Sequence, residues 1–127
     1  MLLTTDRLET RPFMPEDAHQ VYRLNADMDV MRHLPKNEVY ENVKQAQLFL
    51  DRYLERMQEI PFAREAIIRR SDGAWLGWCG LKMLEDGDVD LGFRFHREYW
   101  GNGYATESGK AWVDYGLDVA GLKRIIG

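Results

Sequence analysis

The sequence predicts one α/β or α+β domain, because strand-like and helix-like segments alternate along its 127 residues. Three observations predict this class. Apolar residues recur at helical spacing between residues 41 and 58, two apolar strand-like runs flank a hairpin-turn signal, and a third strand leads through a glycine turn into a further helix. No internal repeat, low-complexity tract or linker separates these segments, so we expect residues 1–127 to form a single domain.

The N-terminal part predicts a strand followed by two helices. Residues 7–13 alternate as a strand does, and Pro15-Glu16-Asp17 is typical of a helix entry, with proline and acids in the first turn. We expect this helix to reach about Asp27. Pro35-Lys36-Asn37 then breaks the chain before the helix at 41–58. Its apolar face comprises Val43, Ala46, Leu50, Tyr53, Leu54 and Met57.

Three further strands are predicted at 62–70, 74–84 and 88–95. Ser71-Asp72-Gly73 is a hairpin signal between the first two, and a turn at 85–88 precedes the third. Trp75 and Trp78 lie an odd number of positions apart, so on a regular strand their side chains point to opposite faces.

Composition excludes several classes of function. The formal net charge of −4 argues against non-specific nucleic-acid binding, which needs a basic surface. No apolar run approaches the ~20 residues that span a bilayer, and the first residues lack the basic and apolar regions of a signal peptide. A single cysteine, Cys79, excludes an internal disulfide framework, so we expect a cytoplasmic protein. His19, His33 and His96 share no metal-ligand spacing, so no metal is expected.

The most informative stretch is Tyr99-Trp100-Gly101-Asn102-Gly103-Tyr104-Ala105-Thr106-Glu107. Two glycines at i and i+2 let the backbone approach a ligand closely and aim free N–H groups in one direction. The first turn of the following helix, at 102–118, adds unpaired N–H donors and the positive end of the helix dipole. Together they suit a phosphate or a pyrophosphate.

These residues resemble the acyl-CoA-binding motif of the GNAT superfamily of N-acetyltransferases, and more closely its RimJ/RimL-type branch. Further segments that resemble this branch are Thr5–Phe13, Asp17-Ala18, Leu76–Leu81 and Gly121–Ile126. The resemblance implies a GNAT fold, with a mixed, mostly antiparallel sheet and flanking helices. The last of these segments corresponds to the lead into a fifth strand.

The resemblance also implies a reaction: acetyl transfer from acetyl-CoA, as co-substrate, to a primary amine, either a small molecule or a protein N-terminus. It implies that the backbone near Phe93 polarises the thioester carbonyl, and that Asp90 is the first candidate for the general base, with Asp88 and Glu107 as alternatives. For the acceptor pocket we consider Asp27, His33 and Trp78. The expected cofactor-binding residues are Phe93, Arg94, Phe95, Trp100, Gly101, Asn102, Gly103, Tyr104, Ala105 and Thr106.

Two departures from the family pattern qualify this interpretation. Glu98 stands where many members have Gln or Arg, and an acid there should weaken phosphate binding. The chain also stops at Gly127, so we expect a C-terminally truncated fold that lacks the segment carrying the usual Tyr or Ser acid. An open sheet edge would follow, and we expect a homodimer that covers it. The alternative function is a catalytically weak or inactive acyl-CoA-binding or interaction module.

Overall fold

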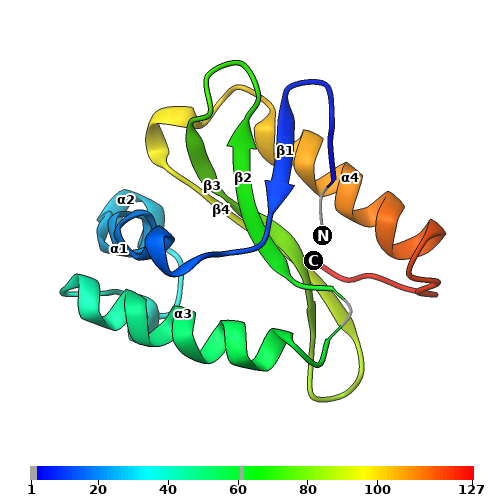
Figure 1. Ribbon diagram of the computed structural model, residues 1–127, viewed down its shortest axis with the longest axis horizontal. Coiled ribbons are helices and arrows are strands. Elements are labelled where there is room, and N and C mark those ends of the chain that lie inside the picture. Colours follow the sequence, from blue (N-terminus) through cyan, green and yellow to red (C-terminus); the bar gives the residue numbers. More distant parts are fainter. Residues whose placement is uncertain (1–2, 61) are drawn as a thin grey trace.

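A four-stranded antiparallel sheet, in the order β1-β2-β3-β4, forms the centre of the computed structural model, which describes residues 3–60 and 62–127. Helix α4 covers one face of the sheet, while α1 and α3 cover the other (Figure 1). The strands are β1 (Leu8–Arg11), β2 (Arg64–Arg69), β3 (Trp75–Met83) and β4 (Val89–Phe95). The helices are α1 (Ala18–Ala26), α2 (Met28–Met31), α3 (Val43–Met57) and α4 (Tyr104–Asp118), with single 3-10 turns at Pro15–Asp17, Lys36–Glu38 and Arg97–Tyr99.

Local signals explain where the helices begin. Asn42 caps α3: its side chain accepts a hydrogen bond from the Gln45 N–H, and the Gln45 side chain accepts one from the Asn42 N–H. The expected entry at Pro15 is a 3-10 turn that continues into α1. The one-turn helix α2, which the sequence analysis did not predict, begins where the Asp27 carboxylate accepts from the Asp29 N–H.

The two faces of the sheet bury separate apolar clusters. Between the sheet and α4, the large side chains of Leu76, Leu81 and Trp112 are fully buried. Between the sheet and α1 and α3, Leu24 and Leu50 are fully buried. Each helix therefore holds the sheet through one apolar face.

Trp75 and Trp78 pack in the same cluster, on the α1/α3 side, and not on opposite faces as expected. The reason is a β-bulge. Ile67 pairs with Gly77 and Ile68 pairs with Trp75, so Leu76 is an extra residue in β3. One extra residue reverses the alternation beyond it, and the two tryptophans come to share a face.

The C-terminal residues lie beside β4. Asp90 and Ile126 form a parallel bridge, in which the Leu91 N–H donates to the Ile126 carbonyl at 2.7 Å and the Ile126 N–H donates to the Val89 carbonyl at 2.9 Å. This isolated parallel bridge lies outside the four antiparallel strands, in the segment expected to lead into a fifth strand. Among the residues that the structure describes, no helix is both long and apolar enough to cross a membrane.

Candidate functional site

A cavity of about 550 Å³ lies at the glycine turn, where β4 ends and α4 begins. It brings together nine of the ten residues expected to bind the cofactor, from Phe93 in β4 to Thr106 in α4. The exception is Asn102, whose side-chain amide donates to the Tyr99 and Trp100 carbonyls and so holds the turn together. The other nine residues therefore line one concave surface, and Asn102 stabilises the turn through these two hydrogen bonds.

The backbone of the turn needs glycine at both positions. Gly101 has a φ of +80° and Gly103 a φ of +79°, a region that other residues seldom adopt. Gly103 is also the N-cap of α4 and offers no side-chain cap, so the first N–H groups of the helix keep no capping partner from that residue. These donors, with the positive end of the helix dipole, suit an anionic ligand in the cavity.

The N-terminal segment braces this turn. Arg7 donates through Nη1 to the Asn102 carbonyl at 2.9 Å and through Nε to the Glu107 carboxylate at 2.7 Å. Glu107 also accepts from Thr5 and from the Arg7 N–H. Burial pushes the pKa of Glu107 upward, but these hydrogen bonds outweigh it and hold that pKa below its ordinary value. Glu107 thus acts as an anchor of the turn, which leaves it a poor candidate for the base.

Phe93 presents its backbone to the open edge of β4. The N–H of Leu91 donates away from β3 to Ile126, and the carbonyl of Phe95 accepts, on the same edge, from the Trp100 indole at 3.0 Å. Backbone groups alternate in direction along a regular strand, and the β3–β4 register runs without a break from Val89 to Phe95. The Phe93 N–H therefore points to this edge, into the region that the cavity occupies.

The opposite wall of this cavity comes from α2 and the residues after it: Asp29, Val30, His33 and Leu34. This wall was not predicted from the sequence, although Val30 and Leu34 are four positions apart, at helical spacing, after the Asp27 cap. His33, which the sequence suggested for the acceptor pocket, lies in the lining of the glycine-turn cavity. Asp27 caps α2 and lies 3.6 Å from Arg97, outside the cavity lining.

Glu98 does not line the glycine-turn cavity. Its carboxylate lies 3.5 Å from Arg23, and both side chains are more than half exposed. The expected weakening of phosphate binding by this acid therefore loses its geometric basis.

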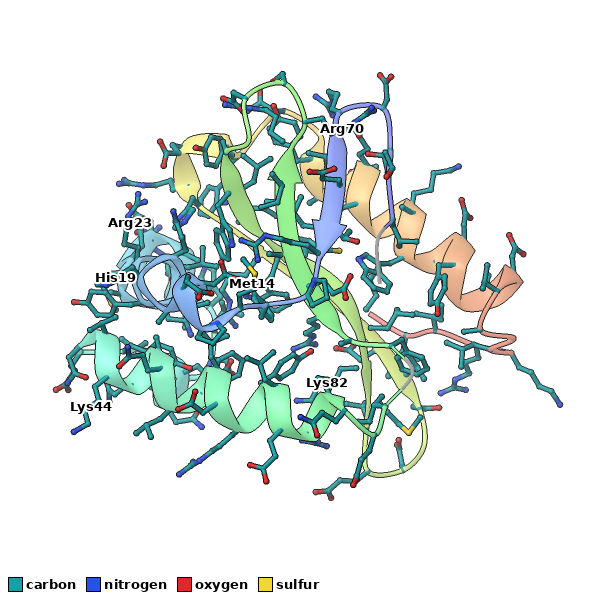
Figure 2. All side chains as sticks on the ribbon, viewed as in Figure 1. Met14, His19, Arg23, Lys44, Arg70 and Lys82 are labelled. Atoms are coloured by element: carbon teal, nitrogen blue, oxygen red, sulfur yellow. The ribbon has the colours of Figure 1, made fainter. Side chains whose placement is uncertain are left out.

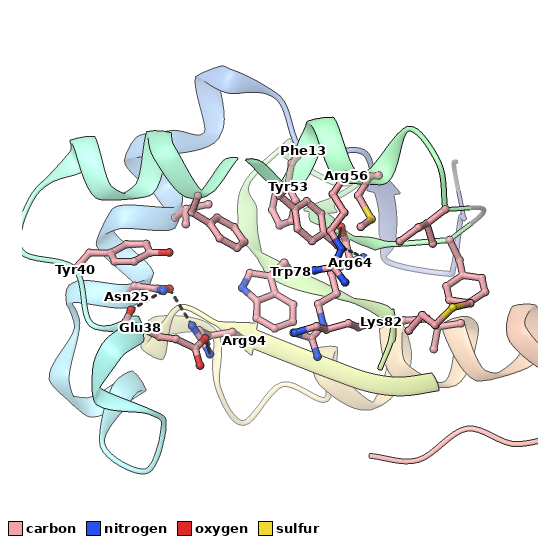
Figure 3. Close-up of a pocket in the computed structure, with 17 residues that line it drawn as sticks. Phe13, Asn25, Glu38, Tyr40, Tyr53, Arg56, Arg64, Trp78, Lys82 and Arg94 are labelled. Carbon is pink, nitrogen blue, oxygen red and sulfur yellow. Dashed lines mark hydrogen bonds and ion pairs between the residues drawn. The ribbon is translucent and has the colours of Figure 1, made fainter. Parts of the chain in front are cut away.

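A second cavity, of about 290 Å³, lies on the α1/α3 side of the sheet (Figure 3). Trp78, which the sequence suggested for the acceptor pocket, lines it together with Phe13 and Tyr53. Arg94 lines both cavities. Its guanidinium is buried and donates to Asn25 at 3.1 Å and to Glu38 at 3.3 Å, and desolvation lowers its pKa.

Asp90 and Arg94 each lie two positions from Gly92, on opposite sides of it along β4. Their side chains therefore point to the same face of the strand. Its carboxylate accepts from Arg64 Nη2 at 2.9 Å, and the Arg64 guanidinium also lies over the Trp78 ring at 4.9 Å from its centroid. Asp88, the other alternative acid, pairs at 3.0 Å with Arg124 on the surface. Of the three candidate acids, only Asp90 is adjacent to residues of the second cavity.

The backbone of Arg64 is held in place by the Tyr53 hydroxyl. Its N–H donates to the Tyr53 hydroxyl at 2.7 Å, and that hydroxyl donates back to the Arg64 carbonyl at 3.3 Å. Burial raises the pKa of Tyr53 to about 12, so this hydroxyl stays protonated and keeps donating at ordinary pH.

No group of three or more His, Cys, Asp or Glu side chains suited to a metal ion occurs in residues 3–60 and 62–127. His19 lies on the outer surface of α1 (Figure 2). Cys79 is buried, and burial raises the pKa of its thiol to about 11, which leaves it a poor nucleophile.

Comparison with known proteins gives concordant matches. A family profile described as "Acetyltransferase (GNAT) domain" matches residues 7–127. The chain is 30% identical over 128 residues to the uncharacterized N-acetyltransferase p20 of Bacillus licheniformis, a match that covers 97% of this chain and 70% of that protein. It is 29% identical over 126 residues to the uncharacterized N-acetyltransferase YoaA of Bacillus subtilis, covering 98% and 71%.

Among solved structures, a GNAT-family acetyltransferase from Bacillus anthracis matches with a TM-score of 0.82 and 24% identity, covering 98% of this chain and 71% of that one. At that identity the match supports the fold alone.

Proposed function

Because the chain belongs to the GNAT acetyltransferase family, we propose that it transfers an acetyl group from acetyl-CoA to a primary amine. The observation that carries the proposal is the cavity at the glycine turn. Nine residues selected from the sequence for cofactor contacts converge on it, and Phe93 directs its N–H toward it. Assignment to the RimJ/RimL-type branch is part of this proposal.

The residues of the cavity fit acetyl-CoA. Gly101 and Gly103 keep the turn free of side chains where a pyrophosphate would approach, and the α4 N-terminus supplies N–H donors. Acetyl-CoA would supply the acetyl group as an activated thioester. The Phe93 N–H would donate to the thioester oxygen, on which negative charge develops as the amine attacks.

Asp90 would accept the proton that the attacking amine loses, directly or through one water. The new bond joins the amine nitrogen to the acetyl carbon, and the carbon–sulfur bond breaks with the electron pair on sulfur. The ion pair with Arg64 fixes the Asp90 carboxylate beside a residue that lines the second cavity, from which the acceptor would enter.

Calorimetric titration with acetyl-CoA, followed by an assay of thiol release over a panel of amines, tests the proposal. Gly103→Val should abolish both binding and turnover. Gly73→Val is the matched control, because Gly73 has a similar φ of +76° but lies in the hairpin turn, outside the cavity. Absence of binding to the unmodified protein up to millimolar acetyl-CoA would refute the proposal.

A second candidate function is an acyl-CoA-binding module with little or no activity. The ion pairs favour it, since Asp88, Asp90 and Glu107 each already have a basic partner. Saturable binding of acetyl-CoA without thiol release across the amine panel would support the module over the enzyme.

We further propose that the protein is a cytoplasmic homodimer. Besides the sheet edge expected from the sequence, the dimer is supported by an exposed apolar surface at the end of α4, where Leu117 is 43% and Val119 72% exposed beside the C-terminal segment. Light scattering at micromolar concentration should show two chains, and Val119→Glu should reduce them to one. Met28→Glu, at an exposed apolar residue on α2, is the control. A monomeric unmodified protein would contradict the proposal.

A further inference from the structure

The second cavity is basic, although the whole chain carries a net charge of −4. Its described lining contains four cationic side chains and one carboxylate, that of Glu38. Charge of one sign gathered in a low-dielectric cleft attracts ligand groups of the opposite sign. The four cations are Arg56, Arg64, Lys82 and Arg94.

Three of these cations lie together. Figure 3 shows Arg56, Arg64 and Lys82 on one side of the Trp78 ring, with Arg94, Asn25 and Glu38 on the other. They come from α3, β2 and β3, and Figure 2 shows Lys82 near the C-terminal end of α3. The basic group is therefore assembled by the tertiary fold from three separate elements.

The pairing of these cations is incomplete. Arg64 uses Nη2 for Asp90, while Arg56 and Lys82 form no ion pair within the part of the chain that the structure describes. Neither of them lines the glycine-turn cavity, so they are not placed to contact phosphates there. Positive charge in the second cavity thus exceeds what the protein's own carboxylates neutralise.

The remaining lining limits the size and character of a ligand. Phe13, Phe49, Tyr53 and Trp78 supply aromatic surface, and the volume of about 290 Å³ is at the lower end of small-molecule sites. Such a space suits a molecule of the size of an amino acid better than a length of polypeptide.

We propose that the acceptor is a small amine that also carries an oxyanion, a carboxylate or a phosphate, and that Arg56, Arg64 and Lys82 bind this oxyanion. The inference rests on the proposed acetyltransferase function and names its substrate class. Arg64 lies against Gly92, next to Phe93, so the oxyanion site and the reacting amine lie within the span of one small molecule, since strand residues are spaced by about 3.3 Å.

Matched acceptor pairs test the inference by turnover. The pairs are 4-(2-aminoethyl)benzoate against its carboxamide, and tyramine phosphate against tyramine; the oxyanion lies far enough from the amine to leave its basicity similar. We expect at least a tenfold higher kcat/KM for an oxyanion-bearing member. Lys82→Gln, at an exposed residue, and Arg64→Gln should each reduce that preference. Arg124→Gln, which breaks another Arg–Asp pair outside the cavity, should preserve it.

Binding without an amine separates this inference from the proposed function. Calorimetry with phenylacetate, phenyl phosphate and uncharged phenylacetamide needs no turnover. Preferential binding of either anion, weakened at least fivefold by Lys82→Gln but unchanged by Arg124→Gln, supports the inference even if no amine is acetylated. Equal binding of the amide and the anions, or a turnover preference for the neutral amines that Arg64→Gln leaves unchanged, would overturn it.

Discussion

The guanidinium of Arg64 occupies the space directly above Gly92. A β-carbon built at residue 92 would lie 2.5 Å from Arg64 Nη2, the atom that donates to Asp90. Because residue 92 has no side chain, the Arg64 guanidinium, which comes from β2, can reach across β3 and lie against β4. The ion pair between Arg64 and Asp90 therefore depends on residue 92 being glycine.

We accordingly predict that Gly92→Ala displaces the Arg64 guanidinium and impairs function more than stability. The displaced group is the end of a flexible side chain, so the loss of unfolding free energy should stay within about 1 kcal/mol. The kcat/KM for the best amine should fall at least tenfold, because the Asp90 carboxylate loses its orienting partner. Steady-state kinetics and urea unfolding of the same preparation check both parts; unchanged kinetics would contradict the prediction.

Two glycines of α4 should respond to alanine in opposite directions. A β-carbon at Gly109 would have ordinary contact, 3.6 Å from Leu91, so alanine should stabilise the helix by about 0.5–1 kcal/mol. At Gly116 it would lie 2.6 Å from Ile125 and 3.1 Å from Leu81, and we expect a loss of about 1–3 kcal/mol from overpacking. Denaturant unfolding measures both. Similar effects at the two positions would contradict the close packing of Ile125 against Gly116 of α4.

The cap of α3 should contribute measurably to stability. Asn42→Ala removes the acceptor for the Gln45 N–H, and the free energy of unfolding should fall by about 1 kcal/mol. Gln47→Ala, at an exposed position in the same helix, should change it by less than about 0.5 kcal/mol. An equal loss in the two variants would argue that the cap is not formed.

Burial of His96 should make stability depend on pH. Desolvation lowers the pKa of His96 below its ordinary value of 6.5, with a further contribution from Arg23. As pH falls through 6.5 toward the lower folded-state pKa, the unfolded chain binds a proton that the folded chain does not, so unfolding becomes easier. Urea unfolding at pH 7.0 and pH 5.5 should show a larger loss for the unmodified protein than for His96→Gln. Equal losses would contradict this assignment.

Much of the glycine-turn site could be predicted from the sequence because its signals are local. The strand alternation before Phe95, the two glycines, and the helix that follows lie within one continuous stretch, and each prescribes backbone conformation directly. The cap at Asn42 is local in the same sense, and the observed bounds of α3 lie within the expected 41–58.

Contacts between distant segments could not be obtained in this way. The bulge that brings Trp75 and Trp78 to one face depends on which β2 residue pairs with which β3 residue, and alternation alone carries no such register. Two other features likewise depend on how the helices pack on the sheet. One is the cavity wall that α2 forms, and the other is the position of Glu98 beside Arg23 and outside the cavity lining.

The sequence by itself determined the family, the order of the elements and the glycine turn before α4, because these follow from patterns of neighbouring residues. Only the tertiary structure decided the character of the second cavity. Arg56, Arg64 and Lys82 are scattered among acidic and apolar neighbours in a chain of net negative charge. They form a basic group only because α3, β2 and β3 converge there, and electrostatic attraction depends on distance in space.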